Sequence, residues 1–139
     1  MVEVAEVVDI NLVAVLVSAA VMFLIGSVWY SPMLFAKPWQ ALTKLKEKDL
    51  RQNMASSYVG AFLSFLIIAY ALAYFVGQLG AESAMEGAVV AGLVAFGFAV
   101  PLTLSNALMH NTRKKLWSIN TGYAIVGLLV MGAILGAWR

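Results

Sequence analysis

Cysteine is absent from this sequence of 139 residues, and histidine occurs only once. Without cysteine the chain can form no disulfide, no thiolate nucleophile and no cysteine-ligated metal site. Charge is also scarce, because 12% of the residues are charged whereas soluble domains carry ~25%. This shortage of charge argues against a soluble domain.

The missing charge is concentrated in four stretches that contain no Asp, Glu, Lys or Arg. These stretches are Ile10–Ala36, Gln52–Ala81, Gly87–Thr112 and Leu116–Trp138. Each is longer than the ~20 residues that a helix needs to cross ~30 Å of hydrocarbon. We therefore predict an all-α integral membrane protein with four transmembrane helices in a single domain, residues 1–139.

The expected helices follow these apolar runs, and Asp9 or Asn11 can cap the first of them. Their bounds are Ile10–Tyr30, Ser56–Gln78, Gly87–Met109 and Trp117–Trp138. Ser83, with Glu86 three residues later, forms a capping box before the third helix. Glu86 could alternatively be a buried carboxylate that serves ion transport, but its place at the helix mouth favours the cap.

The segment between the first two helices, Pro32–Met54, is too polar to cross a membrane. Pro38 suits a helix start, and the residues after it alternate at helical spacing. One face has Trp39, Leu42 and Leu45, and the other has Lys44, Lys46 and Lys48. This pattern predicts a short amphipathic helix on the bilayer surface. The alternative is a solvated, lysine-rich loop anchored by one tryptophan.

Pro101 lies inside the third expected helix. It removes one backbone hydrogen bond and clashes with the carbonyl group four residues earlier, at Gly97. We therefore predict a kink, with the hydroxyl group of Thr103 or Ser105 satisfying the freed backbone group.

Basic residues indicate the orientation. Eight of the nine lie in two loops, five in the first loop and three in the third. They are Lys37, Lys44, Lys46, Lys48, Arg51, Arg113, Lys114 and Lys115. Because such residues favour the cytoplasmic side, we predict a multi-pass protein of the cell membrane with both termini outside. Topology also explains the net charge of +2 without a nucleic acid partner.

Several short motifs run along most of the chain. They are Ile10-Asn11, Gly26-x-x-Trp29-Tyr30-Ser31-Pro32-x-Leu34-Phe35-x-Lys37-x-Trp39, Glu86-Gly87-Ala88, Gly97-Phe98-x-x-Pro101, Gly122-Tyr123 and Met131-Gly132-Ala133-Ile134-x-Gly136-x-Trp138. In these motifs the chain resembles a family of small prokaryotic membrane proteins known as domain of unknown function 1761. The resemblance implies the same four-helix layout, and it implies no activity and no catalytic residue. Ala36 stands where the family pattern usually has glycine, which bears only on the local turn.

Polar side chains gather at one depth when the helices are threaded in the predicted orientation. They are Tyr30, Ser31, Asn53, Ser56, Asn106, His110, Asn120 and Tyr123. Because uncharged polar groups at that depth usually face protein or water, they form a candidate polar pocket bounded by the Pro101 kink. The alternative is interhelical hydrogen bonding together with interfacial anchoring. Asn106 and Asn120, on consecutive helices, are placed for an amide–amide contact.

The sequence shows no combination of residues that is typical of a catalytic or metal-binding site. His110 has no second partner of the type that a metal site or a nucleophile–base pair needs. We therefore expect no catalytic residue, no metal and no cofactor, and hence no enzyme. No charged residue is expected at the mid-depth of the bilayer, which argues against ion-coupled transport.

Small residues recur at every fourth position, as in Gly132-x-x-x-Gly136 and in Ala69, Ala73 and Gly77. This spacing predicts tight helix packing in the lipid bilayer, with a homo-oligomer as a further expectation. The leading functional hypothesis is transport or channel-like passage of a small solute, between subunits or at the kinked third helix. The alternative is a non-catalytic structural or accessory subunit that packs against another membrane protein.

Overall fold

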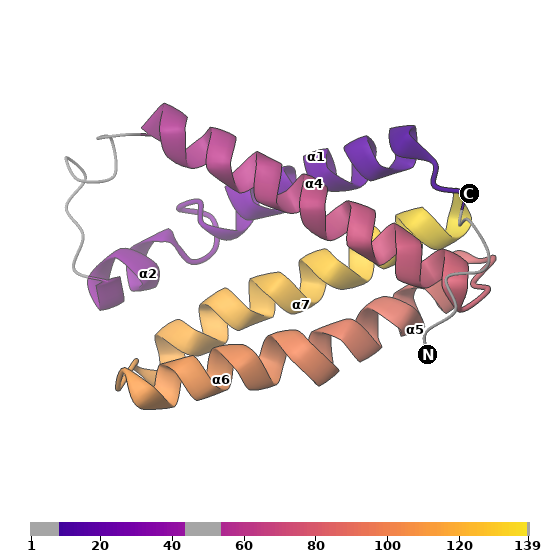
Figure 1. The fold of residues 1–139 in the computed structure, drawn as a ribbon. Coiled ribbons are helices and arrows are strands. Elements are labelled where there is room, and N and C mark those ends of the chain that lie inside the picture. Colours follow the sequence, from indigo (N-terminus) through magenta and orange to yellow (C-terminus); the bar gives the residue numbers. More distant parts are fainter. Residues whose placement is uncertain (1–8, 44–53, 139) are drawn as a thin grey trace.

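The computed structural model describes residues 9–43 and 54–138, and every regular element in them is a helix (Figure 1). These elements are α1 (Leu12–Trp29), α2 (Ala36–Thr43), α4 (Met54–Gln78), α5 (Ala84–Val94), η1 (Ala95–Ala99), α6 (Val100–Met109) and α7 (Lys114–Ala137). Since α5, η1 and α6 form one span, four helices are long and apolar enough to cross a membrane. The predicted all-α fold, with a short helix between the first two spans, is confirmed.

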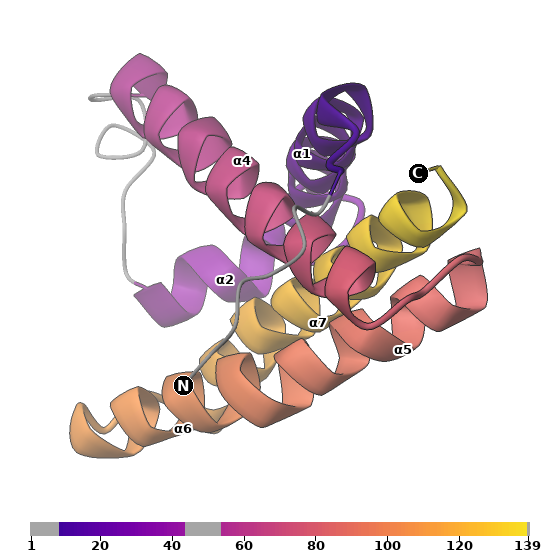
Figure 2. The same ribbon diagram turned by 45° about the vertical axis from the view of Figure 1, so that its right-hand side comes forward.

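Successive spans run antiparallel, and α7 lies among the other three (Figures 1 and 2). It contacts α1, α4 and the span formed by α5, η1 and α6. As a result, 44% of the most apolar stretch of α7 is buried, against 17% for α4. The last of these spans therefore organises the packing of the others, and most of the apolar surface of α4 is not covered by the described residues.

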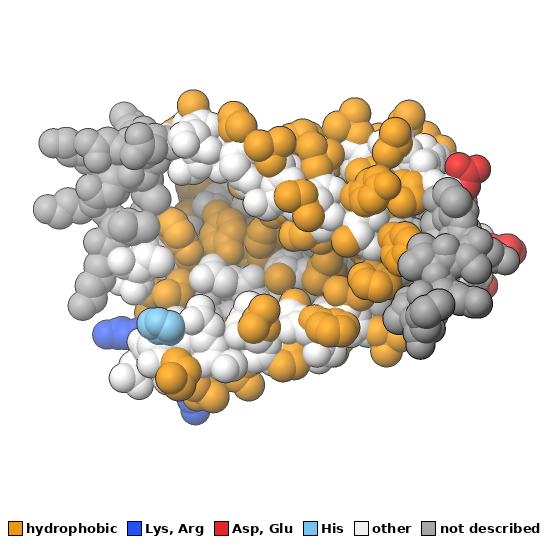
Figure 3. Space-filling view, viewed as in Figure 1, with side chains coloured by type: hydrophobic (Ala, Val, Ile, Leu, Met, Phe, Trp, Pro, Cys, Tyr) orange, Lys and Arg blue, Asp and Glu red, His pale blue; other side chains and the backbone are white. Residues whose placement is uncertain are grey.

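The two ends of the bundle differ in charge over the described residues (Figure 3). The end called here the acidic end has Asp9, Glu82 and Glu86, and the opposite, basic end has Lys37 and the residues 113–115. The start of α1 and the end of α7 both lie at the acidic end. There the Asn11 side-chain amide donates to the Trp138 carbonyl oxygen at 3.5 Å.

Both predicted helix caps are present at the acidic end. The Asn11 side-chain oxygen accepts from two backbone amides of the first turn of α1, at 3.1 and 3.2 Å. The Ser83 hydroxyl accepts from the backbone amide of Glu86 at 3.1 Å. The Glu86 carboxylate in turn accepts from the amide of Glu82 at 3.2 Å, one residue before the expected partner. Glu86 itself is exposed, as a capping role requires.

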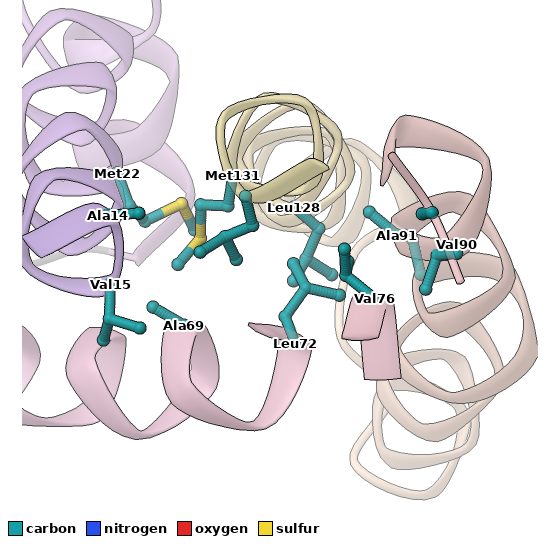
Figure 4. Packing of buried hydrophobic residues seen from close by; sticks show 13 residues of the cluster. Ala14, Val15, Met22, Ala69, Leu72, Val76, Val90, Ala91, Leu128 and Met131 are labelled. Carbon is teal, nitrogen blue, oxygen red and sulfur yellow. The ribbon is translucent and has the colours of Figure 1, made fainter. Parts of the chain in front are cut away.

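The hydrophobic core fills the acidic half of the bundle. In α4 the buried side chains are Ala69, Leu72 and Val76, all in its second half, and they face Leu128 and Met131 of α7 (Figure 4). The other labelled members come from α1 and α5, namely Ala14, Val15, Met22, Val90 and Ala91. Many of these side chains are small, so the helices meet at short range rather than through long interdigitating chains.

Glycines bring the backbones of α5 and α7 into contact. A Cβ atom added at Gly87 would lie 2.9 Å from the Gly136 Cα atom and closer still to the Gly132 carbonyl oxygen. A Cβ atom added at Gly132 would lie 2.5 Å from the Ala91 Cβ atom. The predicted tight packing through Gly132-x-x-x-Gly136 is present, and the contact is made within one chain.

The third span accommodates Pro101 through a segment of π-helix. The five residues of η1 precede the proline, and the Val100 amide donates to the Ala95 carbonyl, five residues back. The wider π-helical turn accommodates Pro101, which provides no backbone N–H group for a helical hydrogen bond. The Thr103 hydroxyl donates to the Ala99 carbonyl at 2.8 Å, not to the carbonyl of Gly97 as expected. The backbone irregularity before Pro101 is therefore a π-helical segment, and the predicted kink stays a prediction.

At the basic end α4 diverges from α6 and α7 (Figures 1 and 2). None of the described residues from Met54 to Ile68 is buried. This half of α4 follows α1 instead, through edge-to-face contacts of Phe23 with Tyr58 and Phe62 at centroid distances of 5.6 and 6.4 Å. A hollow, visible in Figure 3, opens between α4 and α6 at this end.

The short helix α2 lies at the basic end and contacts α7. It begins at Ala36, so Pro38 falls in its first turn, and Trp39 packs edge to face on Tyr30 at 5.6 Å. The predicted Leu45 and the three lysines of the polar face lie outside the described residues. Trp39, a member of the predicted apolar face, therefore packs against another part of the protein.

Candidate functional site at the basic end

The segment from Trp29 to Ala36 folds into a compact turn that joins α1 to α2. Proline at position 32 cannot continue the helix and restricts the residue before it. The Ser31 hydroxyl donates to the Val28 carbonyl at 2.6 Å, and the Phe35 amide donates to the Trp29 carbonyl at 3.1 Å. These bonds hold the Trp29 and Phe35 rings together, with centroids 5.0 Å apart. The turn therefore presents a fixed group of aromatic side chains to α7.

Trp29 attaches the end of α1 to α7. Its indole N–H donates to the Ile119 carbonyl oxygen at 2.9 Å. The ring can come this close because residue 122 is glycine, where an added Cβ atom would lie 3.2 Å from the indole. A tryptophan on one helix thus bonds the backbone of the other beside a glycine.

Tyr123 makes the same kind of contact in the opposite direction. Its hydroxyl donates to the Met22 carbonyl oxygen of α1 at 2.7 Å. Here the glycine is Gly26, where an added Cβ atom would lie 2.7 Å from the tyrosine oxygen. We call the two contacts, of Trp29 with Gly122 and of Tyr123 with Gly26, the reciprocal clasp. It gives a physical reason for Gly26 and Gly122 in the two motifs that contain Trp29 and Tyr123.

Tyr30 connects the clasp to an amide. Its hydroxyl donates to the Asn120 side-chain oxygen at 2.7 Å, and its ring lies edge to face with Tyr123 at 5.5 Å. A tyrosine hydroxyl is protonated at neutral pH and can donate, and burial raises the pKa of Tyr30 further, to about 12. Asn120 itself is exposed, in the first half of α7.

The predicted pocket residues therefore divide into two groups. Tyr30, Asn120 and Tyr123 are brought together, whereas Ser31 serves the local turn. His110 bonds the backbone carbonyl of Asn106 through Nδ1 at 2.9 Å, within the last turn of α6. The Asn106 side chain is exposed and makes no hydrogen bond to any described residue.

The expected amide–amide contact between Asn106 and Asn120 is not formed, and the Asn120 side-chain oxygen accepts from the Tyr30 hydroxyl instead. Ser56 is exposed in the first turn of α4, and Asn53 lies outside the described residues. The tyrosines thus take the place that the sequence suggested for a second amide.

A second polar contact links α6 to α7 and was missed from the sequence. The Trp117 indole N–H donates to the Thr103 hydroxyl at 3.3 Å, and that hydroxyl lies 3.4 Å from the hydroxyl of Thr121. Thr121 is buried, so its hydroxyl needs such a partner. The spacing of Trp117 and Thr121, four residues apart on one helix face, was the available signal.

One row of α7 runs from the core toward the basic end, where the hollow opens. Asn120, Ala124 and Leu128 follow each other at intervals of four residues and so share a helix face. Leu128 is buried and faces α4 in the core (Figure 4), whereas Asn120 on the same face is exposed. Exposure along the row therefore rises toward the basic end, where α4 also diverges from α7.

The site offers aromatic faces, hydroxyls and one amide, without a formal charge among these groups. No group of three His, Asp or Glu side chains that could hold a metal occurs in the described residues. Such a surface can stack on an apolar solute and exchange hydrogen bonds with it.

Comparisons with known proteins give one result. A family model described as a protein of unknown function, DUF1761, matches residues 13–136. No curated protein and no solved structure matches the chain.

Proposed function

The chain belongs to the DUF1761 family of proteins of unknown function, and we propose that it moves a small solute across the membrane through the hollow at its basic end. The observation that carries the proposal is the asymmetry of the bundle. At the acidic end α4 packs against α7, whereas at the basic end it diverges from α6 and α7 while it stays on α1, as in a carrier that is open to one side of a membrane.

Closure at the acidic end depends on contacts between backbones. Gly87 of α5 touches Gly132 and Gly136 of α7, and Leu72 and Val76 of α4 are buried in the same core. An open concavity of about 580 Å³ lies at the acidic end, outside these contacts. Its lining residues are Asp9, Ile10, Asn11, Glu82, Gly136 and Ala137.

The solute class that we propose follows from the polar side chains at the basic end. Tyr30, Asn120 and Tyr123 provide hydrogen bonds and ring faces, and the buried groups between the spans are uncharged. An ion would lose its hydration without gaining a counter-charge there. The solute we propose is therefore uncharged or amphipathic.

The side of the membrane follows from charge. We propose that the basic end faces the cytoplasm of a cell-membrane protein and that both termini are outside. Single cysteines at Lys114 and Ser83 can be labelled in intact cells with an impermeant thiol reagent. Labelling at position 83 alone is expected, and labelling at 114 alone would reverse the orientation.

The hollow can be tested with the same chemistry, since the native chain has no cysteine. In proteoliposomes a charged, water-soluble maleimide should label cysteine at Asn120 and Ala124 and leave Leu128 unlabelled. Leu102 is 72% exposed on α6 and is the matched control, because a thiol facing hydrocarbon does not meet the reagent. Equal labelling at 120, 124 and 102 would show that the hollow has no aqueous access of its own.

Transport itself is measured by light scattering after an osmotic step, with glycerol and urea as uncharged probes. The wild type should accelerate entry of at least one probe over empty liposomes. Ala124→Trp should abolish most of the gain by filling the hollow, and Leu102→Trp should keep it. If neither probe enters faster with the wild type, transport of small uncharged solutes is wrong.

A second candidate is a non-catalytic accessory subunit that packs against another membrane protein. It is favoured by one observation, the low burial of α4, which exposes apolar side chains along most of its length. A water-accessible hollow without flux of either probe would favour this candidate. Both candidates are non-enzymatic.

A homo-oligomer also stays a proposal, and it needs a surface other than Gly132 and Gly136, which are used within the chain. Native mass spectrometry in mild detergent tests it, and a purely monomeric spectrum would contradict it.

A further inference from the structure

Two apolar grooves lie side by side on the lipid-facing surface of α1. The first, of about 460 Å³, follows the seam between α1 and α4, and the second, of about 310 Å³, follows the other side of α1. The first is lined by Ala20, Phe23, Leu24, Tyr58, Val59, Phe62 and Leu63. The second is lined by Val21, Leu24, Ile25, Val28, Trp29 and Leu34.

Leu24 belongs to both grooves and is the ridge between them. Its side chain is 63% exposed, so it projects from the helix surface while the grooves run past it on either side. Two parallel grooves with one shared wall can receive two parallel chains. A single rod, such as a helix of another protein, would have to lie on the ridge.

The length of the grooves indicates the same occupant. On α1 they extend from Ala20 to Trp29, where the helix ends at the basic end. At 1.5 Å per residue this stretch is roughly 14 Å long, about half of the ~30 Å hydrocarbon thickness of a bilayer. A membrane-spanning partner would need a groove of full thickness, whereas an acyl chain of one leaflet needs half.

The basic residues near the grooves indicate which lipid headgroup they would favour. Leu34, in the turn that joins α1 to α2, lines the second groove, and Lys37, exposed at the start of α2, follows three residues later. The described basic residues, Lys37 and residues 113–115, all lie at this end. Basic groups next to a lipid site favour anionic headgroups by about 1 kcal/mol for each charge near the surface, or roughly fivefold in affinity.

We infer that the paired grooves bind one anionic diacyl phospholipid, with one chain on each side of Leu24 and the phosphate toward Lys37. This site is separate from the hollow between α4 and α6, and it does not depend on transport. The lipid joins the free edge of α1 to the first half of α4, which has few protein contacts elsewhere.

Native mass spectrometry of the purified full chain tests the inference with three probe lipids. They are dioleoyl phosphatidylglycerol, dioleoyl phosphatidylcholine with the same chains, and single-chain lysophosphatidylglycerol. The first should be retained at least fivefold more than the second, and the third should be retained less than the first. Equal retention of the two diacyl lipids would overturn the anionic site, and equal retention of the single-chain lipid would overturn the paired grooves.

Variants then locate the site. Val28→Trp fills the second groove and should reduce phosphatidylglycerol retention at least fivefold, as should Leu24→Ala, which removes the ridge. Leu102→Trp is the matched lipid-facing control and should leave retention unchanged. Lys37→Gln should remove most of the preference for the anionic headgroup while diacyl binding persists.

Because Leu24, Val28 and Leu102 are more than half exposed, their substitution leaves the core intact, and thermal melting without lipid checks this. Unchanged retention in Val28→Trp and Leu24→Ala would overturn the location. A lipid-free dimer in place of the adduct would assign the grooves to a second copy instead.

Discussion

The acidic and basic halves of this bundle are held together by different means. In the acidic half, glycine and alanine let helix backbones touch, as between Gly87 of α5 and Gly132 of α7. In the basic half, aromatic side chains reach across to the neighbouring backbone, as Trp29 does to Ile119. Backbone contact excludes everything between the helices, whereas contacts through rings leave spaces beside them. The difference teaches that residue size along the spans, rather than hydrophobicity, decides which end of the bundle is closed.

The largest expected effect is the loss of the acidic half in Gly87→Leu. The added side chain has no space, since even its Cβ atom would lie 2.9 Å from the Gly136 Cα atom. We expect the free energy of unfolding to fall by about 3 kcal/mol, the upper range for overpacking, or the helices to separate. Thermal melting in detergent, followed by tryptophan fluorescence, measures this.

Gly60→Leu on α4 is the matched control for that substitution, because nothing lies within 4 Å of an added Cβ atom there. Its melting temperature should equal or exceed that of the wild type, since leucine favours a helix more than glycine does. Equal destabilisation by both variants would mean that the backbone contact of α5 and α7 is not what closes the acidic end.

A smaller effect is expected when the reciprocal clasp of the basic half is broken. Gly26→Ala places a methyl group 2.7 Å from the Tyr123 oxygen and should displace the ring, at a cost of about 1–2 kcal/mol in the free energy of unfolding. Tyr123→Phe loses only the hydrogen bond to Met22, at about 0.6–1 kcal/mol.

The double mutant of Gly26→Ala and Tyr123→Phe tests whether the two residues act as one unit. Once Gly26→Ala has displaced the ring, removing the hydroxyl should cost little more, so the double mutant should be less destabilised than the sum of the single ones. Strict additivity in thermal melting would show that Gly26 and Tyr123 act independently and that the clasp is not one unit.

The smallest expected effect distinguishes Asn120 from Asn106. Tyr30→Phe and Asn120→Leu remove the two ends of one hydrogen bond, so their double-mutant cycle should give a coupling of ~0.6 kcal/mol. Asn106→Leu and Asn120→Leu should instead be additive, because the two amides do not meet. Coupling between the two asparagines, with none between Tyr30 and Asn120, would contradict the arrangement.

Local features of this protein could be predicted from the sequence because short-range physics decides them. Charge-free runs longer than the bilayer thickness require helices, so the four spans and their approximate bounds were predicted correctly. The caps at Asn11 and Ser83 need only a side chain and an amide within one helical turn. The close packing of Gly132 and Gly136 follows from the same small-residue spacing.

Partners across the bundle were decided by the tertiary structure alone. The sequence placed Asn120 at the right depth, but it could not say that the Tyr30 hydroxyl rather than the Asn106 amide would meet it. It likewise gave no sign that α4 follows α1 at the basic end and leaves the hollow beside α6. The physical reason is that hydropathy fixes the depth of a residue in the membrane and not its direction around the helix axis. That direction depends on which small residues lie opposite which rings, and only the assembled helices determine it.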